Sequence, residues 1–317
     1  MGNKMEGRVA LRSASIARAY FAIQAVAGAG WWVAVFSSED VRRATLGSWD
    51  HRLFAGPDLL LFVGASALTA AYGNRVFAVV VAVWTTLVTV ALTVQGLVGQ
   101  EAGWGVVAMA VATLGTLAAT ASLWLGGLPS HWFFVGPFAF RVAGEGSGAK
   151  HLRRSLAQLV VFWTAFFIVI PMVLVAVERR LQVTAPVLDH RGVGTIGVVV
   201  LLAASVVGLW SCVTMALQGE GTPLPAETAR NLVVTGPYRH VRNPMAVAGA
   251  LQTIAVGLIL GSWVVAAIAV AGSVAWNAII RPEEEADLAA RFGEQYDRYR
   301  THVRCWVPAS TWRDPAS

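Results

Sequence analysis

The chain has 317 residues, of which 56% are hydrophobic and only 13% are charged, and its formal net charge is +6 at pH 7. Soluble domains contain about 25% charged residues, so this composition argues against a soluble protein. Two cysteines, Cys212 and Cys305, offer no disulfide framework, and the scattered histidines have no metal-binding spacing, so we expect no bound metal.

Apolar segments follow one another along most of the chain. A helix that crosses a bilayer needs about 20 mostly apolar residues. Segments that approach or reach this length lie at residues 16–36, 58–72, 76–98, 104–126, 156–176, 194–217, 244–260 and 262–280. Only Gly261 separates the last two, which predicts either two full spans or a helical hairpin. We therefore expect an all-α polytopic membrane protein with about eight transmembrane segments.

The polar residues divide the chain into three parts. Residues 1–128 hold four spans with almost no titratable groups inside them, so we expect an accessory region that acts as a scaffold or interaction module. Residues 129–154 combine aromatic residues with a Gly/Ser-rich turn, which predicts a cytoplasmic loop and linker. Residues 155–317 carry the polar chemistry and form the predicted core. An inverted-repeat transporter would show matching halves, which this chain lacks.

Basic residues are concentrated in the N-terminal tail, in the 127–155 and 218–243 loops and in the C-terminal tail. The positive-inside bias predicts that these segments are cytoplasmic, and it accounts for the net charge without a nucleic-acid partner. The 178–193 loop fits this topology least well, because its arginines would lie outside. The frequent Ala, Val and Arg, with only two lysines, indicate a prokaryotic source with a GC-rich genome, and hence its plasma membrane.

Polar chemistry is concentrated in three blocks near the C-terminus. Residues 219–244 form a basic loop that runs into Pro244, which suits the first turn of the next span. Residues 276–285 end the last span, and Pro282 is expected to kink the helix or begin a new one. Residues 283–303 have the apolar periodicity of an amphipathic helix that could cap a site at the membrane surface.

These blocks would suit a zwitterionic cofactor such as S-adenosylmethionine (SAM). Arginine suits its carboxylate, glutamate its ammonium or ribose diol, and an aromatic face its sulfonium. The residue types alone also allow a simpler interpretation, in which the arginines follow the positive-inside bias and the glutamates favour a helix N-terminus.

The segments "LVVTGPYRHVRNPM" and "EEEADLAARFGEQYDRYRTHVRCWVP" resemble the membrane methyltransferases, which include the isoprenylcysteine carboxyl methyltransferases and the phospholipid N-methyltransferases. The resemblance covers about residues 219–308. It implies an all-helical membrane core with a hairpin over residues 244–280. It also implies SAM bound from the cytosol and a lipophilic or prenylated acceptor that enters from the bilayer.

The resemblance also implies the site residues. The family's functional positions fall on Arg242, Glu284 and Glu285, which we expect to be catalytic and to hold SAM. The other expected cofactor-binding residues are Val234, Gly236, Tyr238, His240, Asn243, Pro244 and Gly249. We expect Arg242 to meet the cofactor carboxylate and Glu285 its ammonium or ribose. Trp276 is either a neighbour of the sulfonium or an ordinary interfacial tryptophan.

Three departures from the family pattern concern the acceptor. Asn243 replaces a common histidine, Ala246 a tyrosine and Ala248 a glycine, with Gly249 one position later. The acceptor stays open among a prenylated cysteine, an amino-headgroup phospholipid, an isoprenoid acid and a small thiol. For an amine acceptor, the candidate bases are Glu284, Glu285 and His240.

Two other functions remain as alternatives. An NADPH-dependent reductase of the sterol-reductase type could use Arg239 and Arg242 for the 2′-phosphate, but Glu284 and Glu285 oppose it. A non-catalytic membrane partner would be favoured by charges inside the spans, which the spans largely lack.

Overall fold

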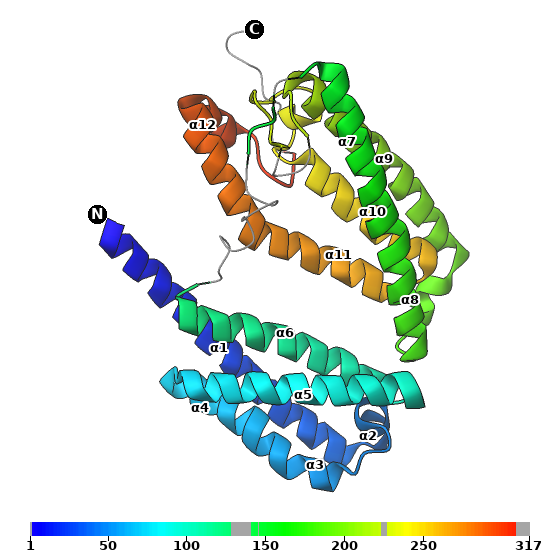
Figure 1. Cartoon of the computed structure of the whole chain (residues 1–317). Helices are drawn as coiled ribbons and strands as arrows, with labels where there is room; N and C mark the ends of the chain where they lie inside the picture. Colours follow the sequence, from blue (N-terminus) through cyan, green and yellow to red (C-terminus); the bar gives the residue numbers. More distant parts are fainter. Residues whose placement is uncertain (1, 128–140, 145, 223–226, 309–317) are drawn as a thin grey trace. The chain divides into compact units, whose positions relative to one another are not determined.

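The computed structural model describes residues 2–127, 141–144, 146–222 and 227–308 (Figure 1). Helices account for the regular structure of these residues, apart from one isolated bridge between Val142 and Thr228. The predicted all-α class is confirmed. The aromatic stretch of the expected 129–154 loop and the prolines at positions 223 and 225 lie outside the described residues.

The chain forms two compact units. One comprises Met1–Pro129 with Val177–Val183, and the other comprises Ser130–Ala176 with Thr184–Ser317. The helices of the first unit are α1 (Gly2–Ser37), α2 (Glu39–Leu46), α3 (His51–Asp58), the π-helical η1 (Leu59–Gly64), α4 (Ala65–Tyr72), α5 (Arg75–Gly99) and α6 (Gly103–Leu125).

Short polar side chains begin several helices of the first unit. Asn74 Oδ1 accepts a hydrogen bond from the Val76 amide at the start of α5, and the Ser38 hydroxyl accepts one from Val41 at the start of α2. These caps satisfy amides that have no partner within the helix. The core of the unit is apolar and includes Phe21 and Val81, neither of which is exposed.

Arg180, one of the arginines of the 178–193 segment, has a structural role in the first unit. Its Nε donates to the Leu97 carbonyl at 2.6 Å and its Nη2 to the Val98 carbonyl at 3.3 Å, within the first unit. These carbonyls lie in the last turn of α5, where backbone acceptors lack helical partners and a cation is favourable. Local helix capping therefore gives Arg180 a structural role.

The second unit contains the remaining helices. They are α7 (Gly148–Trp163), η4 (Thr164–Val169), α8 (Ile170–Arg180, which ends in the first unit), η5 (Pro186–Asp189), α9 (Arg191–Gln218), η7 (Gly236–Arg239), α10 (Pro244–Leu260), α11 (Trp263–Ala275), η8 (Trp276–Ile280) and α12 (Arg281–His302). Small residues allow α9 and α10 to pack closely, since a Cβ on Gly197 would lie 2.9 Å from the Ala255 carbonyl oxygen. Gln252 also donates to Ser205 Oγ at 2.9 Å.

Seven helical segments within the described residues are long and apolar enough to cross a membrane, and α10 is a shorter apolar helix of 17 residues. At 1.5 Å per residue α10 is about 26 Å long, close to the bilayer core of about 30 Å. Together these segments match the predicted spans one for one. Gly261, with a φ of 66°, reverses the chain between α10 and α11 and forms the predicted helical hairpin.

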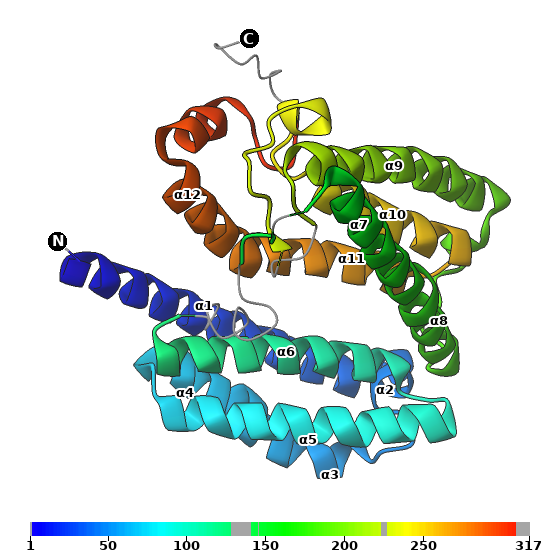
Figure 2. The same ribbon diagram turned by 45° about the horizontal axis from the view of Figure 1, so that its top comes forward.

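The segment Trp263–His302 has 40 residues and is longer than a bilayer requires. Its apolar part ends with η8 at Ile280, and the polar α12 lies beyond the span. The helix direction changes between α11 and α12 (Figure 2), as expected where a π-helical stretch interrupts the helix. Pro282 occupies the first turn of α12, where its missing N–H has no helical partner to lose.

Gly293 divides α12 into two helical pieces. Its φ of 51° and ψ of −130° are not helical, and residues with a side chain rarely adopt them. The predicted continuous amphipathic helix over 283–303 is therefore interrupted. The interruption lies at the glycine of the Phe292-Gly293 pair in the second segment that resembles the membrane methyltransferases.

Candidate active site

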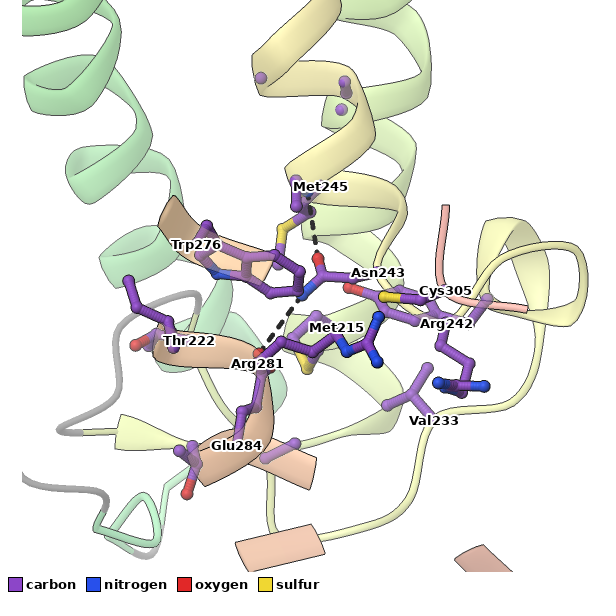
Figure 3. A pocket seen from close by; sticks show the side chains of 18 of the residues that line it. Met215, Thr222, Val233, Arg242, Asn243, Met245, Trp276, Arg281, Glu284 and Cys305 are labelled. Carbon is purple, nitrogen blue, oxygen red and sulfur yellow. Dashed lines mark hydrogen bonds between the residues drawn. The ribbon is translucent and has the colours of Figure 1, made fainter. Parts of the chain in front are cut away.

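A cavity of about 550 Å³ lies within the second unit. Its lining comes from α7, η4, α9, α10, η8, α12 and the chain between α9 and α10. Figure 3 shows the side chains of Arg242, Asn243, Met245, Trp276 and Glu284 around it. This volume is in the range of small-molecule sites, about 300–1,000 Å³.

The loop before α10 is held against the second piece of α12. Tyr299 donates its hydroxyl proton to the Tyr238 carbonyl at 2.5 Å, and the Arg242 amide donates to the Arg304 carbonyl at 3.0 Å. Leu232 and Val234 pack against the buried cluster of Tyr296, Tyr299 and Val303. Tyr296, Tyr299 and Val303 of α12 and its C-terminal end thus fix the loop that carries Tyr238 and Arg242.

Arg242 connects this loop to both ends of α12. Its Nη2 lies 2.6 Å from Glu285 Oε1, and its Nη1 donates to the carbonyls of Arg300 at 3.1 Å and Val303 at 2.5 Å. The side chains of Arg242 and Glu285 are only 13% and 18% exposed. A guanidinium suits this role because its donors form a rigid fork.

The three acids that line the cavity in the described chain are paired differently. Glu285 pairs with Arg242 and lies 3.4 Å from Arg281 Nε, and Asp287 pairs with Arg291 at 2.8 Å. Glu284 forms no ion pair among these residues. Within the described residues, its side chain accepts one long hydrogen bond of 3.4 Å from Asn243 Nδ2.

Glu284 is therefore a lining acid without a paired cation among the described residues. Burial, and then the negative charges of Glu285 and Asp287, raise the pKa of Glu284 from 4.5 to about 7. A carboxyl of this kind is near its titration point at neutral pH, and a cationic ligand would favour its charged form. Such perturbed groups in cavities are typical of functional sites.

Four buried donor atoms of lining residues have no hydrogen-bond partner in the described chain, namely Thr222 Oγ1, the Tyr238 hydroxyl, Arg242 Nε and Arg281 Nε. Of these, Arg281 Nε lies 3.4 Å from Glu285 Oε1. Burial, with a further contribution from the Glu284 charge, raises the pKa of Tyr238 well above its usual value, so the hydroxyl stays protonated. Buried donors are normally satisfied, and the Tyr238 hydroxyl and Arg242 Nε would suit an anionic group of a bound ligand.

The other part of the cavity is apolar and aromatic. Phe162, Trp163, Phe166 and Phe167 come from the end of α7 and from η4, and Met245 and Gly249 come from α10. Phe162 and Phe166 are also 42% and 47% exposed on a segment long and apolar enough to cross a membrane. The cavity therefore joins a charged region near α12 to an apolar region among the spans.

The structure brings six of the predicted site residues to the cavity, namely Tyr238, Arg242, Asn243, Gly249, Glu284 and Glu285. Trp276 lines it as well. Val234, Gly236, His240 and Pro244 do not, and their positions suggest support of the loop. Gly236 has a φ of 57°, and Pro244 is buried at the first turn of α10.

Sequence reasoning missed several lining residues. Asp287 and Arg291 occupy one face of α12 at a spacing of four, a pattern that also describes an ordinary exposed ion pair. Met215 and the aromatic residues of α7 and η4 carry no signal that separates them from lipid-facing residues. No group of three or more His, Cys, Asp or Glu side chains in the described ranges is arranged to hold a metal ion.

Residues 193–295 match the phospholipid methyltransferase family. The match includes α9, α10, α11 and the first half of α12, and it agrees with the resemblance carried by the Gly-Pro-Tyr-Arg and Glu-Glu motifs. It indicates a membrane methyltransferase. No curated protein and no solved structure matches the chain significantly.

Proposed function

We propose that this protein transfers the methyl group of SAM to a lipophilic acceptor at the cytoplasmic face of the plasma membrane. The family match of residues 193–295 supports methyl transfer. The observation that carries the proposal is Glu284, which has no ion-pair partner among the described residues and lines a cavity with unpartnered buried donors and an apolar region. A charged cofactor and a hydrocarbon acceptor require such a mixed site.

The residues present suit the polar groups of SAM. Glu284 would hold the ammonium group, because it is the lining acid without a cationic partner in the described chain. Arg242 Nε and the Tyr238 hydroxyl would donate to the carboxylate. The face of Trp276 would suit the sulfonium.

This assignment changes the expected role of Glu285. Its carboxylate is already bound to Arg242 and lies near Arg281, so it would position Arg242. Removing water from such a pair strengthens it. Glu285 would then act on the cofactor through the guanidinium.

Bound SAM supplies an electrophilic methyl group whose departure leaves a neutral thioether, so no general acid is required. The chain would orient the acceptor in line with that methyl group and exclude water from the cavity. A carboxylate acceptor would need no base. An amine acceptor would need to lose a proton, for which Glu284, Glu285 and His240 are the candidate bases.

The apolar region between η4 and α10 would hold the hydrocarbon part of the acceptor. Its aromatic side chains fit an isoprenoid or acyl chain, so the acceptor group is either an isoprenoid or prenylcysteine carboxylate or a lipid headgroup. Arg239 is exposed and lies outside the cavity lining. The lining arginines Arg242, Arg281 and Arg291 each lie beside an acid of α12, so none of them is an unpaired cation for the 2′-phosphate of NADPH. The geometry therefore favours the methyltransferase over the reductase.

The test is calorimetric titration of SAM and NADPH into the protein in lipid nanodiscs, followed by transfer of labelled methyl groups to membrane extracts. We expect saturable SAM binding, no NADPH binding and label in a lipophilic product. An Arg239→Ala variant is the matched control and should behave as wild type. Binding of NADPH without SAM, or binding of neither, would contradict the proposal.

Gly249 provides a separate test of the cavity. A Cβ at this position would meet no atom within 4 Å, so a leucine has room to enter the empty space. We expect Gly249→Leu to keep or raise stability by about 0.5 kcal/mol through helix propensity. We expect methyl transfer to fall about tenfold or more, because the side chain occupies ligand space.

Gly272→Leu is the matched control, since Gly272 is exposed on α11, also has no atom within 4 Å of its Cβ position, and lies outside the lining. Thermal unfolding and single-turnover methyl transfer would be measured for both variants. Equal activities of the two variants would show that the space beside Gly249 is not used by a ligand.

A further inference from the structure

A second cavity, of about 380 Å³, lies within the first unit, among helices that the proposed methyl transfer does not use. Its walls come from α1, α2, α3, η1, α5 and α6. Most of the lining is apolar, and it is unusually aromatic, with Trp31, Trp32, Trp49, Phe54, Phe62 and Trp84. The cavity is therefore large enough for a small organic group and rich in π-systems.

One acidic side chain, Asp58, lines this aromatic cavity. It is only 7% exposed and belongs to the span His51–Tyr72. Trp32 Nε1 donates to Asp58 Oδ2 at 2.8 Å, and Trp84 Nε1 donates to Oδ1 at 2.6 Å. Acids inside membrane spans are rare and usually functional.

The backbone around Asp58 is also specialised. Pro57 precedes it within α3, and the π-helical η1 begins at Leu59, directly after it. Short π-helical turns frequently occur at functional sites. Here the irregular stretch places the carboxylate between tryptophans of two other helices, α1 and α5.

The Asp58 charge has no cationic partner in the part of the chain that the structure describes. The neighbouring polar side chain, Gln24, differs from Asp58 because it carries no charge and its polar atoms have partners in the protein. Gln24 accepts from the hydroxyls of Tyr20 and Thr116 and donates to Ser66, so its amide is satisfied within the protein. Each carboxylate oxygen of Asp58 has a further lone pair after it accepts one indole hydrogen bond.

We propose that this cavity binds the ammonium group of a ligand that carries a hydrocarbon chain. A buried carboxylate supplies the opposing charge, and tryptophan faces are the best aromatic partners for an organic cation. Indole donors hold the carboxylate in place, and its negative charge stays available to a cationic ligand. A hydrocarbon chain suits the apolar walls, which belong to helices that can span the bilayer.

The proposal concerns residues 20–112 alone, so it stands or falls independently of SAM binding in the second unit. The test uses the full chain in nanodiscs and follows tryptophan fluorescence during titration with decyltrimethylammonium. The neutral carbon isostere of this probe, with a tert-butyl group in place of the trimethylammonium, is titrated in parallel. Tetramethylammonium serves as the water-soluble source of the same cation.

We expect wild type to bind decyltrimethylammonium saturably and about tenfold or more tightly than the neutral isostere. Asp58→Asn, which keeps the shape and removes the charge, should weaken binding by a similar factor. Glu39→Gln is the control, because Glu39 is an exposed acid of the same unit paired with Arg43. It should bind as wild type.

Tight binding of tetramethylammonium that Asp58→Asn abolishes would also support the ammonium site, and it would assign the ligand to the aqueous phase. Equal binding of the charged and neutral probes by wild type would overturn the proposal, and this comparison needs no variant to fold. Equal binding of decyltrimethylammonium by wild type and a folded Asp58→Asn would overturn it as well.

Discussion

Replacement of Arg242 by alanine is expected to weaken SAM binding by about 100-fold or more, because it removes a buried, hydrogen-bonded charge. The guanidinium holds Glu285 and the carbonyls of Arg300 and Val303, so its loss removes the side-chain contacts of Arg242 with both pieces of α12. It also leaves Glu285 with only the longer contact to Arg281. We therefore expect lower stability together with lost affinity.

Calorimetry would measure the affinity and thermal unfolding the stability of this variant. Arg242→Lys separates charge from geometry, because an ammonium cannot bind one carboxylate and two carbonyls as a planar fork does. It should recover part of the stability and little of the SAM binding. Arg239→Ala is the control for the general loss of a cation. Retention of wild-type SAM affinity by Arg242→Ala would contradict the proposed role.

Replacement of Glu284 by glutamine is expected to remove the pH dependence of SAM binding. In wild type the pKa of Glu284 is about 7 without ligand. Pairing with the cofactor ammonium requires the charged form, so SAM affinity should rise from about pH 6 to about pH 8. At about pH 8 we expect Glu284→Gln to bind SAM about tenfold or more weakly, and at about pH 6 the difference should be smaller.

The same residue predicts an opposite trend for the unliganded protein. Because the folded pKa of Glu284 lies above its usual value of 4.5, the folded state binds this proton more tightly than the unfolded state. The stabilising contribution of the proton is present below about pH 4.5 and is lost as the pH rises through about 7. Unliganded Glu284→Gln should therefore lose less stability than wild type over this interval.

Thermal unfolding at several pH values, with and without SAM, would test both trends. Glu283→Gln is a suitable control, because Glu283 precedes Glu284 on α12 and lies outside the cavity lining. It should keep the wild-type pH profile. A pH-dependent SAM affinity that persists in Glu284→Gln would assign the titrating group elsewhere.

The helical architecture followed from the sequence because the bilayer imposes a length on each apolar segment. The turn at Gly261 could be predicted from a single glycine between two apolar segments, and its φ of 66° shows the reason. Likewise, the Gly-Pro-Tyr-Arg and Glu-Glu motifs lie at ends of spans, where polar groups accumulate, and Tyr238, Glu284 and Glu285 from these motifs line the cavity.

The roles of individual residues depended on tertiary structure. Arg242 and Glu285 are 43 residues apart, and the change of helix direction between α11 and α12 (Figure 2) precedes the turn of α12 that carries Glu285. Because Arg242 pairs with Glu285, Glu284 has no paired cation among the described residues. From the sequence, Glu285 was expected to meet the ammonium or the ribose of the cofactor. Adjacent glutamates cannot be told apart until the helix direction after η8 is known.

In the first unit, too, the sequence predicted the spans, whereas tertiary packing decided the surroundings of one buried acid. Its apolar segments predicted four spans, and the lack of charges inside them predicted an accessory region that acts as a scaffold or interaction module. Asp58 stands at the edge of its apolar segment in the sequence, where an acid suggests a loop. Only the packing of α1 and α5 places the indoles of Trp32 and Trp84 on its two oxygens. Hydrophobic length is a property of one segment, whereas the partner of a buried charge is decided by how several segments pack.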